Sequence, residues 1–152
     1  MKIQVGRNQK VWFTSDTHYA HTNICRAISN WPDEDKTRDF ESLDKMNAAI
    51  VNAINNNVGP DDILFHLGDW SFGGIENIWN LRKQLKVKTI YFVEGNHDKY
   101  TGVQTIKAML KDIDVQVLEN EVTHFSKLQI IGLNHMAADN KKFNMHASSA
   151  GP

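Results

Sequence analysis

The hydrophobic positions of the chain follow two patterns, one typical of strands and one typical of helices. Short apolar runs rich in β-branched and aromatic residues predict strands, which lie at residues 11–15, 62–67, 89–93, 115–118, 121–125 and 127–131. Apolar residues at helical spacing predict helices, which lie at residues 40–55, 75–85 and 104–111. The short apolar run at residues 3–5 is expected to pair with the first strand.

The order of these elements predicts the fold class. Strands and helices alternate through the first three predicted strands, which implies an α/β domain with parallel pairing at its centre. Residues 24–38 show no regular pattern, and Trp31-Pro32-Asp33 marks a turn or a helix break there. A length of 152 residues suits one domain with a sizeable core, so residues 1–152 are predicted to form a single domain.

Polar side chains that bind metals or carry protons follow three of the predicted strands. In chain order they are Asp16 and His18, then Asp69 directly after Gly68, then Asn96, His97 and Asp98 directly after Gly95. In parallel sheets, sites form outside the carboxyl ends of the strands. Carboxylate, imidazole and amide oxygen together suit a divalent ion such as Mn, Fe or Zn. A carboxylate shared between two ions would permit displacement at phosphorus.

Composition and charge narrow the setting of such a site. The net charge of -1 gives no general attraction to nucleic acid or to anionic lipid. No apolar run has transmembrane length, and the first ten residues lack the apolar region of a signal peptide. Cys25 is the only cysteine, which favours a reducing compartment. These features predict a cytoplasmic protein that has no membrane partner.

On these motifs the chain resembles the calcineurin-like metallophosphoesterases, over residues 10–135. The family signature runs D-x-H, G-D, G-N-H-[DE], a lone His, and G-H-x-H. Its first three motifs match Asp16-Thr17-His18, Gly68-Asp69 and Gly95-Asn96-His97-Asp98. The stretches DTHYAHTNI and HLGDWSFGG are most similar to the small phage and bacterial members. The resemblance implies a sandwich of central β-sheets flanked by helices.

The resemblance also implies a reaction and a set of roles. The expected activity is divalent-metal-dependent hydrolysis of a phosphoester at a site for two metal ions, with Mn first and Fe, Zn or Ni as alternatives. His97 would protonate the leaving oxygen or steady the transition state, and Asp98 would orient His97. The implied metal ligands are Asp16 and His18 for one ion, Asp69 as the bridge, and Asn96 with His135 for the second ion.

The last family motif is altered in this chain. Residues 143–150 read FNMHASSA where a sequence like H-G-H-x-H is expected, so at least one imidazole is missing. His146 is a candidate ligand for the second ion. The chain is truncated at its C-terminus, altered there, or naturally divergent, and the sequence leaves these alternatives open. The rival to an enzyme is therefore a metal-impaired, non-catalytic homologue that acts as a binding or structural protein.

Four further residues are candidates for a role at or near the site. By analogy with related phage-type proteins, His21 would reach a substrate phosphate, against the alternative of an exposed loop histidine. Asn23 and Arg26 are weaker candidates for substrate binding, although an arginine can pair bidentately with phosphate. His66 falls inside a strand, which favours a structural or supporting role. The sequence does not separate monoester from diester substrates, and nucleotides and nucleic acids are included among them.

Overall fold

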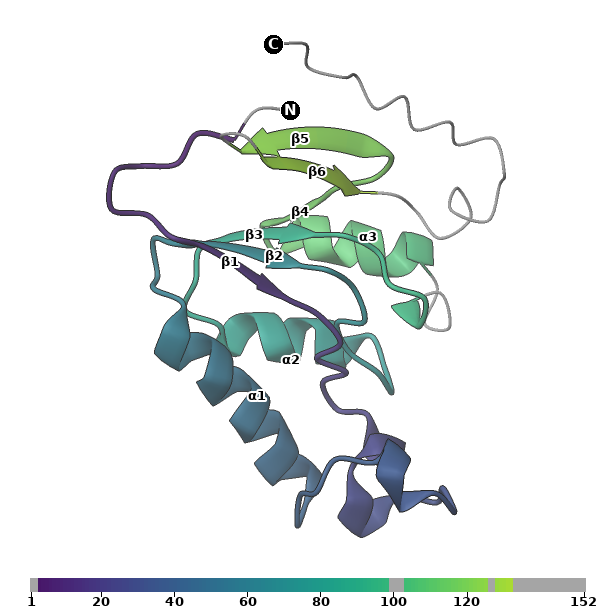
Figure 1. Ribbon diagram of the computed structural model, residues 1–152. Coiled ribbons are helices and arrows are strands. Elements are labelled where there is room, and N and C mark those ends of the chain that lie inside the picture. Colours follow the sequence, from purple (N-terminus) through teal and green to yellow (C-terminus); the bar gives the residue numbers. More distant parts are fainter. Residues whose placement is uncertain (1–2, 99–102, 126–127, 133–152) are drawn as a thin grey trace, which may run out of the picture.

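A computed structural model describes residues 3–98, 103–125 and 128–132 of the chain (Figure 1). Four strands form a parallel sheet in the order β1-β2-β3-β4, namely β1 (Val11–Thr14), β2 (Ile63–His66), β3 (Thr89–Phe92) and β4 (Val115–Val117). Three helices connect these strands in turn: α1 (Leu43–Asn57), α2 (Glu76–Gln84) and α3 (Val103–Asp112). An antiparallel pair follows, made of β5 (Glu121–Phe125) and β6 (Leu128–Gly132).

The parallel sheet is covered on both faces. Leu64, Ile90 and Phe92 face the three helices and belong to one buried cluster with them. Phe65 and Tyr91 point to the other face, where they join a second buried cluster that reaches β6. Figure 1 shows α1 and α2 on one side of the sheet and the β5–β6 pair on the other. Strand β2 is buried at every position, which explains why its first three residues, Ile63 to Phe65, are all apolar.

The expected α/β class with parallel central strands is confirmed, and the predicted elements differ from the observed ones at their ends. The first long helix begins at Leu43 and not at residue 40, because the Ser42 side chain accepts a hydrogen bond from Lys45 N at 3.2 Å and caps the helix there. The expected pairing of residues 3–5 with β1 is wrong. Ile3 N instead donates to His124 O at 3.0 Å, and residues 3–5 form no strand.

Residues 22–38 contain three short 3-10 helices: η1 (Thr22–Ile24), η2 (Arg26–Ile28) and η3 (Glu34–Lys36). Ile24 and Cys25 pack against Met46 of α1 in a small buried cluster, and a parallel bridge joins Cys25 to Arg38. These contacts hold the segment beside the first loop that leaves the sheet. Within the described ranges, no helix is long and apolar enough to cross a membrane.

Candidate metal centre

Three loops leave the carboxyl ends of β1, β2 and β3 at the same edge of the sheet. We call them the first site loop (residues 15–20), the second site loop (67–72) and the third site loop (93–98). Asp16 N donates to Gly68 O at 3.1 Å, and His18 N donates to Asp69 O at 2.9 Å. These hydrogen bonds fasten the first loop to the second along its length.

The backbone of these loops is left-handed at the residues that matter chemically. Asp16, His18 and Asp69 have φ angles of 52°, 47° and 56°. The left-handed conformation costs a residue with a Cβ roughly 1–2 kcal/mol of free energy. This conformation therefore persists only where surrounding contacts enforce it. Strain of this kind collects at functional sites. Here it turns three side chains out of the strand direction and toward one another.

Two glycines allow the second and third loops to cross closely. Gly68 has a φ of 101°, and a Cβ placed on it would lie 2.3 Å from Gly95 N. A Cβ on Gly95 would in turn lie 2.3 Å from Asp69 Oδ1. No side chain fits at either position without moving a loop. The glycines in these two motifs are therefore explained by the backbone approach.

Asp98 ties the second loop to the third. Its carboxylate is 2% exposed and accepts hydrogen bonds from Asp69 N and Gly95 N, both at 2.8 Å, and from Trp70 N at 3.2 Å. Burial raises the pKa of Asp98, and the three N–H groups act against this rise. The carboxylate thus fixes the backbone on both sides of the close crossing.

Thr17 anchors the first site loop from the inside. Its hydroxyl donates to Trp70 O at 2.6 Å and lies 2.9 Å from His66 Nε2, so the histidine nitrogen serves as the donor of that second bond. His66 is fully buried, and burial lowers its pKa to about 3. A neutral His66 in the strand therefore supports the loop, which is the structural role expected for it.

Arg38 holds the same loop from the outside. Its guanidinium donates to Thr17 O at 2.8 Å and to Asp16 O at 2.5 Å. Both acceptors are backbone carbonyls of the loop with left-handed residues, so this fork supports the strained conformation directly. The sequence contains no local signal for this contact, because residues 21–37 separate Arg38 from the loop that it holds and form only short 3-10 helices.

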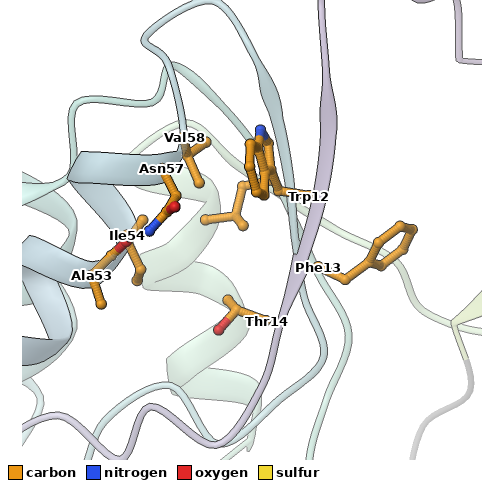
Figure 2. Close-up of a pocket in the computed structure, with 8 residues that line it drawn as sticks. Trp12, Phe13, Thr14, Ala53, Ile54, Asn57 and Val58 are labelled. Atoms are coloured by element: carbon orange, nitrogen blue, oxygen red, sulfur yellow. Dashed lines mark hydrogen bonds between the residues drawn. The ribbon is translucent and has the colours of Figure 1, made fainter.

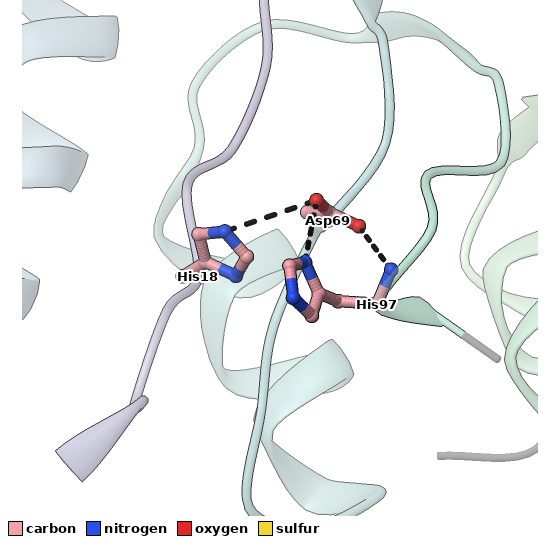
Figure 3. A group of neighbouring side chains, drawn as sticks. All are labelled: His18, Asp69 and His97. Atoms are coloured by element: carbon pink, nitrogen blue, oxygen red, sulfur yellow. Dashed lines mark hydrogen bonds and ion pairs between the residues drawn. The ribbon is translucent and has the colours of Figure 1, made fainter. Parts of the chain in front are cut away.

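His18, Asp69 and His97 form the ligand cluster, since their ligand atoms all lie within 4.8 Å of one another (Figure 3). Asp69 Oδ2 is 3.1 Å from His97 Nδ1 and 3.8 Å from His18 Nε2. Asp69 Oδ1 accepts from His97 N at 2.9 Å. Asp16 Oδ1 lies 3.6 Å from the same nitrogen, His18 Nε2. The carboxylate of Asp69 is therefore at the centre of the arrangement.

The protonation states of His18 and Asp16 suit metal binding. Burial lowers the pKa of His18, although the charge of Asp69 acts against this, so the ring is neutral at pH 7 and offers a lone pair. A hydrogen bond from Ser15 lowers the pKa of Asp16, which keeps that carboxylate charged. Carboxylates and imidazole rings that converge on one point make a donor set that fits a divalent ion.

His21 is buried next to the ligand cluster. Its ring lies 5.7 Å from that of His18, edge to face, and stacks on Phe72 with centroids 4.1 Å apart. Burial lowers the pKa of His21 to about 4, and a proton on the neighbouring His18 ring acts in the same direction. The expected alternative of an exposed loop histidine is wrong, because Phe72 and the first site loop cover the ring.

A pocket of about 230 Å³ elsewhere on the molecule has none of this chemistry (Figure 2). It lies between the edge strand β1 and α1, with Trp12 and Thr14 directed toward the helix and Phe13 directed away. None of its lining residues carries a titratable side chain. The ligand cluster is therefore the better candidate for a functional site.

Comparison with known proteins agrees with the geometry of the site. A family model described as calcineurin-like phosphoesterase matches residues 9–149. The chain belongs to the calcineurin-like phosphoesterase family. The family as a whole consists of phosphoesterases, which are hydrolases, and its members typically bind two divalent metal ions.

Relatives of this chain include proteins without an assigned activity. An uncharacterized protein of Methanocaldococcus jannaschii, MJ1445, is 31% identical over 94 residues, which are 60% of this chain and 48% of that protein. The match thus spans about half the length of the curated relative. The crystal structure of a protein of unknown function from Aquifex aeolicus, AQ665, has a TM-score of 0.55 and 25% identity, over 82% of this chain and 59% of the other. Phosphopantetheinyl hydrolase from Mycobacterium tuberculosis has a TM-score of 0.48 and 18% identity, over 80% and 39% of the two chains.

The structure places the residues of the three family motifs as follows. The members of the first two motifs, Asp16, His18 and Asp69, lie together at the site. His97, expected to act on the substrate, contacts Asp69 and is part of the ligand cluster. Asn96 lies exposed on the turn before it. The expected ligands His135 and His146 lie outside the described residues.

The two weaker candidates for substrate binding make contacts of their own within the segment 22–39. Asn23 O accepts a hydrogen bond from Ser29 Oγ at 2.6 Å. The guanidinium of Arg26 lies 3.3 Å from Asp39 Oδ1 and donates to Thr37 Oγ1 at 3.1 Å. The arginine that contacts the first site loop is Arg38, which sequence reasoning missed.

Proposed function

We propose that this chain is a divalent-metal-dependent phosphoesterase that hydrolyses a phosphate mono- or diester at a two-metal site on the three site loops. The proposal is carried by the convergence of His18, Asp69 and His97, whose ligand atoms lie within 4.8 Å of one another, with left-handed backbone at His18 and Asp69. Membership of the calcineurin-like phosphoesterase family supports the class of reaction.

The metal ions would be held by donors on both sides of the central carboxylate. Mn is the proposed metal, with Fe, Zn or Ni as alternatives that the same oxygen and nitrogen donors accept. When bound, such ions lower the pKa of a water molecule and neutralise phosphate oxygens. The proposed ligands are Asp16 and His18 for the first ion, Asp69 for both, and Asn96, His135 and His146 for the second.

His97 is proposed to assist departure of the leaving group. Asp69 Oδ2, which can only accept, fixes a proton on His97 Nδ1 and so orients the ring. The His97 side chain is 43% exposed, which allows the ring to meet a substrate. Asp98 was expected to orient His97. Its hydrogen bonds to the backbone of the second and third loops suggest that it does so by holding the loop that carries the histidine.

Residues 1–152 are proposed to act as a single domain in a reducing cytoplasm. Cys25 is a free and buried thiol, which suits that compartment. The proposed partner is the phosphoester itself, with no membrane contact.

The test of this function is hydrolysis by the purified chain during titration with Mn. Chromogenic phosphate monoesters and diesters serve as substrates, and chelation of the metal should abolish the rate. His97→Ala should lower turnover of a substrate with a poor leaving group by about two to four orders of magnitude, the usual scale of general acid catalysis. His124→Ala is the matched control, because His124 is exposed on β5, in the layer across the sheet from the helices.

The rival proposal is a non-catalytic homologue that binds metal or a partner. It predicts that Mn binds and raises the melting temperature, yet no ester tested is hydrolysed and His97→Ala changes nothing. An unchanged rate in His97→Ala, in a chain that does hydrolyse a poor leaving group, would remove the role of His97 and leave the metal function standing.

A further inference from the structure

A series of aromatic rings leads away from the ligand cluster. The ring of His18 meets that of His21 at 5.7 Å, and the ring of His21 meets that of Trp31 at 5.8 Å. Phe72 stacks on His21 from the second site loop and holds it in place. Because His21 is buried, it can support Trp31 but is closed to a large ligand group. His21 Nδ1 has no hydrogen-bond partner among the described residues.

Trp31 is the member of this series that reaches solvent. Its side chain is 39% exposed, so part of the ring is open to a ligand. Trp31 N donates to Ser29 Oγ at 3.1 Å, and that hydroxyl donates in turn to Asn23 O at 2.6 Å. The ring is thus held from its backbone and from His21, and it is presented as a preformed surface.

The exposed side of Trp31 lines a pocket of about 270 Å³ together with Pro32, Asp33 and Lys36. Pockets for whole ligands usually measure about 300–1,000 Å³, so this one suits a ring-sized part of a larger ligand. Indole and proline provide flat apolar surfaces. The charged groups of Lys36 and Asp33 pair with each other, Nζ to Oδ2 at 2.9 Å, and the walls of the pocket are almost wholly apolar. A planar ring matches these walls.

The position of the pocket limits how that ring is joined to a phosphate. Two ring contacts, His18 to His21 and His21 to Trp31, separate it from the ligand cluster. A ring bonded directly to the phosphate oxygen is too close to its phosphate to occupy both places, whereas a nucleoside carries a sugar between them. We infer that the site takes phosphoesters of nucleosides, with the phosphate at the site loops and the base stacked on Trp31. This inference rests on the proposed function, which assigns the phosphate end.

The test measures binding, so that it does not depend on hydrolysis. Calorimetric titrations with Mn present compare non-hydrolysable phosphonate analogues of adenosine 5′-monophosphate, glycerol 3-phosphate and phenyl phosphate. Stacking of one base on an aromatic side chain corresponds to about 5- to 150-fold in affinity. The adenosine analogue should therefore bind at least about fivefold more tightly than the other two, which should resemble each other.

Trp31→Leu, which keeps apolar bulk against His21, should remove that preference, and Trp31→Phe should keep most of it. Trp79→Leu is the matched control, because Trp79 is 38% exposed but lies on α2, where it contacts Lys83. The control should keep the full preference, and melting temperatures would verify that all variants fold.

The outcomes separate this inference from the function on which it rests. A preference for the adenosine analogue that Trp31→Leu abolishes supports the base site, whether or not any ester is hydrolysed. Equal affinities for the three analogues, or a preference that survives Trp31→Leu, would overturn it even in an active phosphoesterase. Tight binding of the phenyl analogue that depends on Trp31 would overturn the assignment to nucleosides.

Discussion

Replacing Asp98 by Asn should loosen the joint between the second and third site loops. The carboxylate accepts three N–H groups, two at Oδ2 from Asp69 N and Gly95 N and one at Oδ1 from Trp70 N. The asparagine side chain keeps only one oxygen, and that oxygen can accept the hydrogen bonds from Asp69 N and Gly95 N. Its NH₂ group must then face Trp70 N, so two donors meet at a residue that is only 2% exposed.

The size of the effect follows from these contacts. A hydrogen bond to a charged group contributes about 1.5–3 kcal/mol, and a buried donor without a partner costs about 1–3 kcal/mol. In Asp98→Asn the hydrogen bond from Trp70 N is lost, and the other two hydrogen bonds have a neutral acceptor in place of a carboxylate. Asp98→Asn should therefore lower the free energy of unfolding by about 3 kcal/mol. Displacement of a loop also misorients the metal ligands that it carries, which typically weakens metal affinity about 10- to 100-fold.

Urea denaturation of the metal-free protein measures the first effect, and Mn titration measures the second. Asp61→Asn is the matched control, since the Asp61 side chain is 79% exposed and has one surface ion pair, with Lys88. The free energy of unfolding of Asp61→Asn should stay within about 0.5 kcal/mol of the wild-type value. If Asp98→Asn is as stable as this control and binds Mn equally well, Asp98 does not hold the loops together.

Two further substitutions test the third site loop and its support. Gly95→Ala places a Cβ 2.3 Å from Asp69 Oδ1, so Mn affinity should fall sharply in a titration. Gly6→Ala is the control, because a Cβ at residue 6 would lie 3.7 Å from the nearest heavy atom, and it should leave Mn affinity unchanged. Lys107→Met leaves the buried carboxylate of Glu94 without the ammonium that lies 3.0 Å from it, and urea denaturation should show a loss of about 3 kcal/mol. Burial acts to lower the pKa of Lys107, but its carboxylate partners outweigh this and raise it above 10.5. The stabilisation is therefore complete at neutral pH and is lost as pH rises through the raised value, so the wild type and Lys107→Met should converge in strongly alkaline urea titrations.

The fold was predictable because the spacing of apolar residues indicates which positions of each strand and helix are buried. Strand β2 is covered on both faces, and the apolar run from Ile63 to Phe65 is typical of such a strand. The site loops were predictable for a related reason, since polar residues that directly follow buried strands gather at one edge of a parallel sheet. The left-handed backbone of Asp16 and Asp69 was not predictable, because neither residue type requires it.

The supports of the site depend on tertiary packing that no local pattern encodes. Arg38 reaches the first site loop only because Cys25 pairs with it and packs against α1. Arg26 was the predicted candidate, because an arginine can pair bidentately with phosphate, yet it pairs with Asp39. Residues 24–38 lack regular spacing, so nothing in the sequence distinguished Arg26 from Arg38.

The central claim is that Asp69 organises a metal site on which hydrolysis depends. The most direct measurement determines the Mn content and the rate of ester hydrolysis in the same samples of wild type and Asp69→Asn, with Asp61→Asn as control. The account predicts that wild type and control bind Mn and hydrolyse the ester, and that Asp69→Asn loses both while remaining folded. Full Mn occupancy in Asp69→Asn, or hydrolysis that continues without metal, would contradict it.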